Sequence, residues 1–293
     1  MRGSIPTPGS KTRRYGGNTA CVEVRSEKAL LVFDAGTGIR ELGVELMRNP
    51  PPAGIKIHLF LSHPHWDHIQ GFPFFGPAYA ATTEIKVYCP EGDPKNYQLL
   101  SGQMSNAYFP VRFADLKAQI TQESFHGDGV EAGDFVVRRF NQRHPGGSVG
   151  FRIEHDGSAI VYATDSEIDL QLSDQQLAHQ QPNKLRGVPK ELVTAMRDAN
   201  LLIADAQYTD QEYATRIGWG HPRATTVVDL AAQAEVAQLA LTHHDPMHSD
   251  RDTDEKVTHC AERAVSHRSK LEVFGAREGV VMKVVKTNIR DTK

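Results

Sequence analysis

Three histidines and an aspartate crowd into one short segment of the chain, SHPHWDH. They are His63, His65, Asp67 and His68. Imidazole and carboxylate together bind zinc, manganese, iron and other first-row divalent ions, whereas calcium and magnesium prefer oxygen ligands alone. Pro64 keeps the segment out of a helix interior, so it is predicted to be a metal-binding turn after the preceding apolar run. The alternative, a His-rich surface turn, has little packing reason to follow a buried strand.

Further candidate ligands follow other apolar runs: His144 in FNQRH, Asp165 in YATD, and His243 and His244 in ALTHH. Strand ends deliver side chains to one edge of a rigid sheet, so these groups can converge. Each also has a plainer reading, because Asp165 could cap a turn and His144 could belong to a tight hairpin. His243 and His244 point to opposite faces of an extended chain, so they compete for one ligand position.

The elements that position these residues follow from hydrophobic periodicity. Short β-branched or apolar runs that end in turn residues predict strands over 29–36, 56–63, 84–90, 135–141, 148–155, 158–165, 200–206, 238–245 and 271–285. Helical spacing predicts helices over 188–199, 225–237 and 254–267. Strands cluster early and alternate with helices late, which favours a layered α/β or α+β architecture.

Composition narrows the class of protein. A chain of 293 residues with 39% hydrophobic and 24% charged residues is typical of a soluble globular protein and opposes disorder or a coiled coil. The formal net charge of -3 argues against a broad contact with duplex nucleic acid. Three distant cysteines without CxxC spacing predict neither a disulfide framework nor a zinc knuckle. No apolar leader or membrane-length run is present, so a cytoplasmic location is expected.

The segment His63-x-His65-x-Asp67-His68 resembles the signature of the metallo-β-lactamase superfamily. Within it the chain is similar to the ribonuclease Z-like phosphodiesterase branch, on segments spread over 3–9, 13–24, 30–42, 144–153, 162–167, 201–208, 218–226 and 241–245. The resemblance implies an α+β fold, a four-layer αββα sandwich, in a single hydrolase domain over 1–293. The stretch 92–130 is the least regular part of the sequence and is predicted to be a pocket-forming insertion. Relatives usually begin with a strand before the segment that matches 2–6, whereas Met1 stands directly before that segment here. Either the start is misplaced or shortened, or this protein tolerates a missing edge strand.

The resemblance implies two divalent metal ions, with zinc favoured and manganese or iron as alternatives. The residues implied as ligands are His63, His65 and His144 for one ion, Asp67, His68 and His243 for the other, and Asp165 as the bridge. A hydroxide held between two ions is the nucleophile of two-metal hydrolysis. Asp67 and His221 are the candidate catalytic residues.

His221, in GWGHPRATT, is the candidate general acid or phosphate donor, with a capping or packing role as the alternative. Relatives usually continue this motif with Ser-Thr, whereas Pro222 and Arg223 follow here, which weakens the catalytic assignment. The resemblance also implies that Asp34 is a hydrogen-bonding partner near the metals and that Asp205 orients a histidine. A simple strand-end turn is the alternative for Asp205.

Five further side chains lie near the motifs, and the sequence allows a role for each. Arg143 and Arg152 could bind phosphate oxygens or lie on a solvated strand face. His248 could contact substrate but more often would be a solvated loop residue, and His244 could support a ligand. Trp66 is predicted to pack under the metal loop.

The function predicted from these residues is a phosphodiesterase that cleaves a cyclic nucleotide or small phosphodiester through a metal-bridging hydroxide. Residues 167–200 lack the Gly/Pro-rich arm with which ribonuclease Z grips transfer RNA, and the net charge is -3, so extended nucleic acid and tRNA 3′-processing are disfavoured. The main alternative is a hydrolase of a carbon ester, thioester or β-lactam. A redox member is disfavoured because His65 stands where diiron members carry a carboxylate. Relatives are often dimers, so a homodimer is an open expectation, and no membrane partner is expected.

Overall fold

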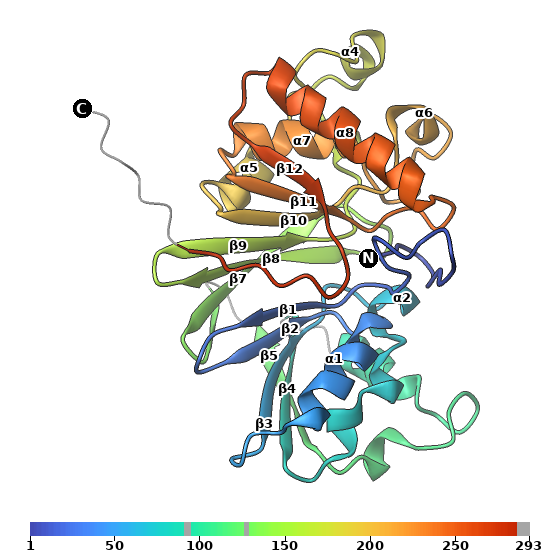
Figure 1. Cartoon of the computed structure of the whole chain (residues 1–293), viewed down its shortest axis with the longest axis vertical. Helices are drawn as coiled ribbons and strands as arrows, with labels where there is room; N and C mark the ends of the chain where they lie inside the picture. Colours follow the sequence, from blue (N-terminus) through green and yellow to red (C-terminus); the bar gives the residue numbers. More distant parts are fainter. Residues whose placement is uncertain (91–94, 126–128, 286–293) are drawn as a thin grey trace. The chain divides into compact units, whose positions relative to one another are not determined.

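The computed structural model describes residues 1–90, 95–125 and 129–285, whose contacts group into two compact units (Figure 1). The first unit comprises residues 1–9 and 16–136, and the second comprises 10–15 and the described residues from 137 onward. Each unit contains a β-sheet, helices and a hydrophobic core of its own. The prediction of a single domain over 1–293 stays a prediction.

The sheet of the first unit has the strand order β1-β2-β3-β4-β5. Its strands are β1 (Val22–Arg25), β2 (Leu30–Phe33), β3 (Ile55–Phe60), β4 (Thr83–Pro90) and β5 (Gln119–Phe125). β1 is antiparallel to β2, and β2 to β5 run parallel to their neighbours. Phe33 pairs with Phe60 in register, so the segments that begin at Asp34 and Leu61 leave the sheet at the same edge.

Apolar side chains of β2 and β3 form the core of the first unit with helix α1 (Gly38–Arg48), which buries Ile39 and Leu42 against it. The short helices are α2 (Trp66–Ile69), η1 (Phe72–Phe74), η2 (Gly76–Tyr79), α3 (Lys95–Gly102) and η3 (Phe113–Asp115). All four residues of β2 are buried, as expected for a parallel strand covered on both faces. A rigid, buried strand therefore leads directly to Asp34.

The sheet of the second unit has the strand order β12-β11-β10-β9-β8-β7. Its strands are β7 (Phe135–Gln142), β8 (Ser148–His155), β9 (Ser158–Ala163), β10 (Leu201–Asp205), β11 (Gln238–Thr242) and β12 (Glu272–Gly275). The short strand β6 (Val130–Ala132) belongs to the first unit. β8 is antiparallel to β9, whereas β9, β10, β11 and β12 are parallel.

The parallel register brings three predicted site residues to one edge of this sheet. Asp205 ends β10 and pairs with Thr242, the last residue of β11. His243 follows directly, and Asp165 lies two residues beyond Ala163 at the end of β9. The carboxyl ends of parallel strands meet at the same edge, so these side chains start from neighbouring backbone positions.

Helices α7 (Ala224–Gln233) and α8 (Asp250–Ser266) pack together and cover this sheet, as Figure 1 shows. The other helices of the unit are η4 (Ile168–Gln171), α4 (Gln175–Gln180), α5 (Lys190–Met196) and α6 (Asp210–Tyr213). α8 begins after Ser249, whose hydroxyl accepts from the amide of Asp252 while the Asp252 carboxylate accepts from the Ser249 amide. This capping box starts the helix four residues before the predicted 254.

The predicted strands from 29–36 to 238–245 are confirmed with small differences at their ends, and all three predicted helices are present. The prediction of strand over 271–285 is wrong in its second half, because strand β12 ends at Gly275 and residues 280–285 form neither strand nor helix. The side chains of Val280 and Val281 are exposed, so this apolar run has no buried face to hold it in a sheet. Elements β1, β5, β6 and α1 were not predicted from the sequence.

Residues 92–94 and 126–128 of the predicted insertion 92–130 lie outside the described residues. Its described part holds α3, η3 and β5, and β5 is an integral strand of the first sheet. Its role as a pocket wall stays a prediction. Residues 167–200 hold η4, α4 and α5 rather than a long arm. Among the described helices, none has the length and apolar character needed to cross a membrane.

Candidate metal centre

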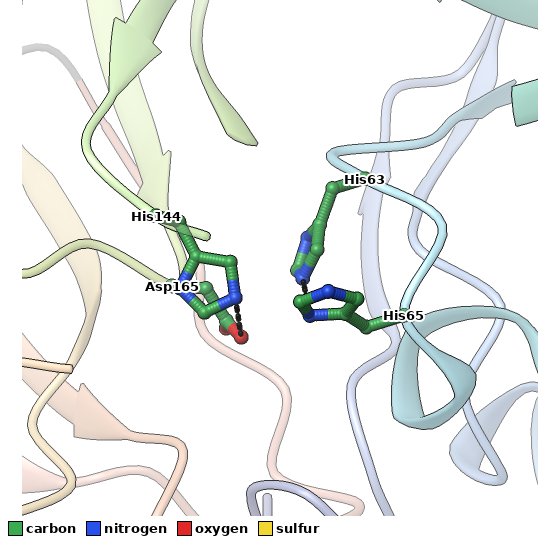
Figure 2. Close-up of side chains that lie close together, drawn as sticks. All are labelled: His63, His65, His144 and Asp165. Carbon is green, nitrogen blue, oxygen red and sulfur yellow. Dashed lines mark hydrogen bonds and ion pairs between the residues drawn. The ribbon is translucent and has the colours of Figure 1, made fainter. Parts of the chain in front are cut away.

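The first donor set lies in the turn between β3 and α2. His63 and His65 flank Pro64, and Asp67 and His68 occupy α2, so the segment is the turn that the sequence predicts. The Nε2 of His63 lies 3.1 Å from the Nδ1 of His65, and Figure 2 draws this pair. The Nε2 of His68 lies 3.3 Å from an oxygen of Asp67. His63, Asp67 and His68 are buried, whereas His65 is exposed.

Asp34 orients two histidines of this set. Its carboxylate accepts from the Nδ1 of His68 at 2.8 Å and from the Ser62 hydroxyl at 2.8 Å. The Ser62 oxygen lies 3.0 Å from the Nδ1 of His63, so Ser62 connects Asp34 to that ring. Asp34 is buried and holds a φ of 63°, a costly conformation for a residue with a side chain. The predicted hydrogen-bonding role of Asp34 is confirmed, and Ser62 is a partner that the sequence did not reveal.

Asp67 is held by backbone from the amino-terminal segment. The Ser4 amide donates to one carboxylate oxygen of Asp67 at 2.9 Å. The prediction that Trp66 packs under this loop is wrong, because its side chain is 74% exposed. In the first turn of α2 the neighbouring Asp67 and His68 point inward, and Trp66 takes the solvent side.

The second donor set comprises His144, Asp165 and His243. The Nε2 of His243 lies 3.1 Å from one oxygen of Asp165, and the Nε2 of His144 lies 3.7 Å from the other oxygen. Figure 2 draws the second of these pairs. The Thr164 hydroxyl also donates to Asp165 at 2.7 Å. The carboxylate thus turns a different oxygen toward each of two imidazoles.

In His144 and His243 the Nε2 atom faces Asp165, and the second ring nitrogen, Nδ1, contacts an oxygen atom. The Nδ1 of His144 donates to the Gly220 carbonyl at 2.8 Å, and the Nδ1 of His243 lies 3.0 Å from the amide oxygen of Gln207. A carbonyl oxygen can only accept, so His144 carries its proton on Nδ1 and presents the Nε2 lone pair. Ligating histidines are usually oriented in this way. The donor set therefore fits a first-row divalent ion such as zinc, manganese or iron.

The structure separates His243 from His244. His243 has a φ of 53° and faces Asp165. The ring of His244 lies edge-on to Tyr15, with 5.5 Å between the ring centroids. The two side chains go to different surroundings, which supports His243 as the candidate ligand.

His221 and Asp205 form a buried pair beside the second donor set. The Nδ1 of His221 donates to Asp205 at 2.8 Å, which confirms that Asp205 orients a histidine. The ring centroid of His221 lies 5.3 Å from that of His144 and 4.9 Å from that of His243. Candidate ligand atoms of Asp165, Asp205, His221 and His243 all lie within 4.8 Å of one another. Because Asp205 already accepts from His221, its carboxylate is suited to positioning that ring.

The segment 218–220 approaches the site through its backbone. Gly220 has a φ of 93°, and a Cβ there would lie 2.4 Å from the Nδ1 of His144, so only glycine fits. The buried Glu167 accepts from the amides of Gly218 at 2.6 Å and Gly220 at 2.8 Å. Glu167 lies in the segment 162–167, one of those that carry the family resemblance, yet its residue type alone did not indicate this role.

The Pro222–Arg223 departure from the family pattern has a structural explanation. Arg223 is buried, its Nε donates to Asp169 at 2.8 Å, and its amide donates to the same carboxylate at 2.8 Å. The Thr226 hydroxyl donates to Asp169 at 2.6 Å. This network anchors the start of α7 directly after His221.

Three other assignments are decided by contacts. Arg152 donates to the carboxylate of Glu154 and to backbone carbonyls near the end of α5, so it serves the fold. Arg143 is exposed. His248 is not a solvated loop residue, because it is buried and its Nε2 lies 2.7 Å from Glu212.

Lys256 is a buried cation that the sequence did not single out. It lies on α8, and its ammonium donates to the carbonyls of Ala206 at 2.6 Å and Gln207 at 3.0 Å. These residues follow Asp205 directly, so Lys256 fixes the backbone between the partners of His221 and His243. Burial, the largest cause, lowers the pKa of Lys256 from 10.5 to about 8.

This shift predicts a pH dependence of stability. Between pH 8 and 10.5 the unfolded chain holds more protons on Lys256 than the folded chain does, so the contribution of Lys256 to the free energy of unfolding should rise with pH, by about 1 kcal/mol per pH unit. Below pH 8 the cost of the buried charge is present in full. In Lys256→Met this rise should be missing. Urea unfolding of both metal-depleted proteins from pH 7.5 to 9.5 measures it, and equal slopes would contradict the assignment.

Comparisons with known proteins identify the family of this chain. A family model described as the beta-lactamase superfamily domain matches residues 30–244, and the chain belongs to the metallo-β-lactamase superfamily. It is 26% identical to ribonuclease Z of Haloarcula marismortui over 82% of this chain and 83% of that protein. Among solved structures, the metallo-beta-lactamase fold protein YhfI from Bacillus subtilis is similar with a TM-score of 0.65, 18% identity and coverage of 96% and 95% of the two chains. The short form of human tRNase Z is similar with a TM-score of 0.61, 19% identity and coverage of 97% of both chains.

These findings confirm the predicted superfamily, the α+β metallo-β-lactamase fold and the resemblance to the ribonuclease Z-like branch. They also confirm the prediction of a metal-dependent hydrolase as the class of enzyme. The identity of the metal, the individual ligands and the substrate stay predictions.

Proposed function

We propose that the protein is a phosphodiesterase that uses two divalent ions, with zinc preferred, and acts on a cyclic nucleotide or another small phosphodiester. The observation that carries the proposal is the Asp165 carboxylate, whose two oxygens face the imidazoles of His144 and His243. A carboxylate arranged in this way is suited to serve two ions at once. The ribonuclease Z relative supports a phosphodiester substrate over a carbonyl substrate.

The proposed ligands are His63, His65 and His144 for one ion, Asp67, His68 and His243 for the other, and Asp165 for both. The Nδ1 contacts of His68, His144 and His243 with oxygen atoms support this assignment. When bound, the ions would activate a water molecule and neutralise charge on the phosphoryl oxygens.

The chain's own residues supply the remaining chemistry. The leaving oxygen of a phosphodiester needs a proton or a hydrogen bond as it departs, and the Nε2 of His221 is the proposed donor. Asp205 holds the proton of that ring on Nδ1, which fixes the orientation of the imidazole. Asp67, the second candidate catalytic residue, accepts from the Ser4 amide, which fixes the orientation of its carboxylate beside His68.

Two features support a small substrate. The formal net charge is -3, which provides little attraction for a long polyanion. Residues 167–200 fold into short helices of the second unit and form no extended basic arm. Extended RNA therefore remains the less favoured substrate, although the relatives are named as ribonucleases.

Metal removal and restoration test the proposed function. Protein dialysed against a chelator should lose hydrolysis of bis(p-nitrophenyl) phosphate, and addition of zinc or manganese should restore it. Release of p-nitrophenolate measures turnover, and metal analysis measures occupancy. Nitrocefin and a thioester serve as carbonyl comparisons. Fully loaded protein that hydrolyses these compounds but not the phosphodiester would overturn the proposal.

A further inference from the structure

Trp219 is an exposed aromatic side chain fixed beside the candidate site. Its indole is 63% exposed, although it lies between Gly218 and Gly220, two residues before His221. A free loop would let such a side chain collapse onto the surface. Here Glu167 binds the amides on both sides of Trp219, and the Tyr213 hydroxyl donates to the same carboxylate at 2.8 Å.

The backbone around Trp219 is part of the candidate site. The Gly220 carbonyl accepts from the Nδ1 of His144, a proposed metal ligand. The next residue is His221, the proposed proton donor. The indole therefore belongs to a held segment that is directly joined to a contact of a proposed metal ligand and to the proposed proton donor.

A cation supports one face of this aromatic group. The guanidinium of Arg216 lies 6.0 Å from the ring centroid of Trp219 and 5.0 Å from that of the buried Tyr208. The ring of Tyr208 in turn meets that of His221 edge-on, with 5.9 Å between centroids. Arg216 also lies 3.9 Å from Glu212 and 3.8 Å from Asp245.

These carboxylates compensate the charge of Arg216, so the guanidinium is suited to stacking under the indole and less to binding a phosphate. Cation–π contact of this kind holds the plane of a Trp ring. The Arg216 guanidinium thus covers one face of the indole. The large exposed area of Trp219 leaves room for a planar ligand.

We propose that Trp219, supported by Arg216, is a stacking platform for the nucleobase of the substrate. The inference rests on the proposed phosphodiesterase function and narrows its substrates to those that carry a base next to the reacting phosphate. Stacking on an aromatic side chain is tolerant of base identity, so the platform would select nucleotides over simple alkyl phosphodiesters without choosing one base.

The kinetic test compares two substrates with one leaving group, thymidine 5′-(p-nitrophenyl phosphate) and methyl p-nitrophenyl phosphate. Trp219→Ala should raise KM for the thymidine ester by about 5- to 150-fold, the range found for loss of one base stack, and leave kcat and metal content unchanged. KM for the methyl ester should change little, and Trp219→Phe should recover most of the discrimination. Val265→Ala, which removes an exposed side chain on α8, is the control.

A binding test gives a readout that does not need turnover. The chain has two tryptophans, so Trp219→Phe leaves only Trp66. Titration of the zinc-loaded wild type with adenosine 5′-monophosphate should quench its fluorescence, whereas ribose 5-phosphate should not. The quenching should be lost in Trp219→Phe.

The outcomes separate the two proposals. Phosphodiester hydrolysis with equal effects of Trp219→Ala on both esters would overturn the platform and leave the proposed function standing. Absence of hydrolysis together with base-specific quenching would support the platform and reject the phosphodiesterase. A change of oligomeric state in Trp219→Ala, without a change in base discrimination, would assign the exposed indole to a subunit contact instead.

Discussion

Replacement of Asp165 by alanine is expected to abolish phosphodiester hydrolysis and to lower the metal content of the protein. Loss of a residue that only orients a ligand typically costs about 10- to 100-fold in affinity or activity. A carboxylate that serves two ions should exceed that range, so a fall in kcat/KM of more than about 100-fold is expected. Metal analysis after dialysis, with the assay on bis(p-nitrophenyl) phosphate, measures both effects.

The design must separate loss of ligation from loss of folding. Asp165 also accepts from Thr164 and contacts His243, so its removal leaves buried polar groups without a partner. Asp165→Asn keeps the shape and one oxygen, and circular dichroism reports whether either variant is folded. Glu191→Ala removes an exposed carboxylate from α5 and should change nothing. Folded Asp165→Ala with full activity and full metal content would show that Asp165 is no shared ligand.

Replacement of His221 by alanine is expected to lower kcat by about 100- to 10,000-fold on a substrate with a poor leaving group, with metal content retained. The reason is that a departing alkoxide needs a proton, whereas p-nitrophenolate leaves readily without one. The loss should therefore be large for a dinucleoside phosphate and small for bis(p-nitrophenyl) phosphate. A structural role alone would lower both rates equally.

Two further variants test whether the effect of His221→Ala comes from the proposed proton transfer. Asp205→Asn should lower the rate on the dinucleoside phosphate, because an amide no longer fixes the proton on Nδ1 of His221. His259→Ala removes an exposed histidine of α8 and is the matched control. Equal losses on the two substrates in His221→Ala would assign this ring to packing or metal support rather than proton transfer.

The candidate ligands could be predicted because their residue types are rare and follow apolar runs. His63, Asp67 and His68 stand out in any reading of the sequence, and Asp165 and His243 follow strands that periodicity identifies. Strand β5 was missed because QITQESF alternates weakly between apolar and polar residues. The apolar run over 280–285 was misleading because periodicity does not report whether a sheet has room for another strand.

The groups that orient the ligands could not be predicted with the same ease. Ser62, Glu167, Gln207 and Lys256 are common residue types, and each acts through a hydrogen bond that depends on tertiary packing. Asp34 and Asp205 were found only through the family resemblance. The position of the exposed Trp219 likewise depends on tertiary packing. The amides on both sides of it donate to Glu167, which lies 52 residues earlier in the chain.

The hydrogen bonds of Asp34, Gln207 and the Gly220 carbonyl to ring nitrogens have a consequence for how metal enters the protein. Small zinc domains gain their structure from the ion, and chelators unfold them. Here the imidazoles of each unit are already oriented by main-chain and side-chain oxygens of buried residues. Chelation should therefore leave both hydrophobic cores folded, and reloading should need no refolding step.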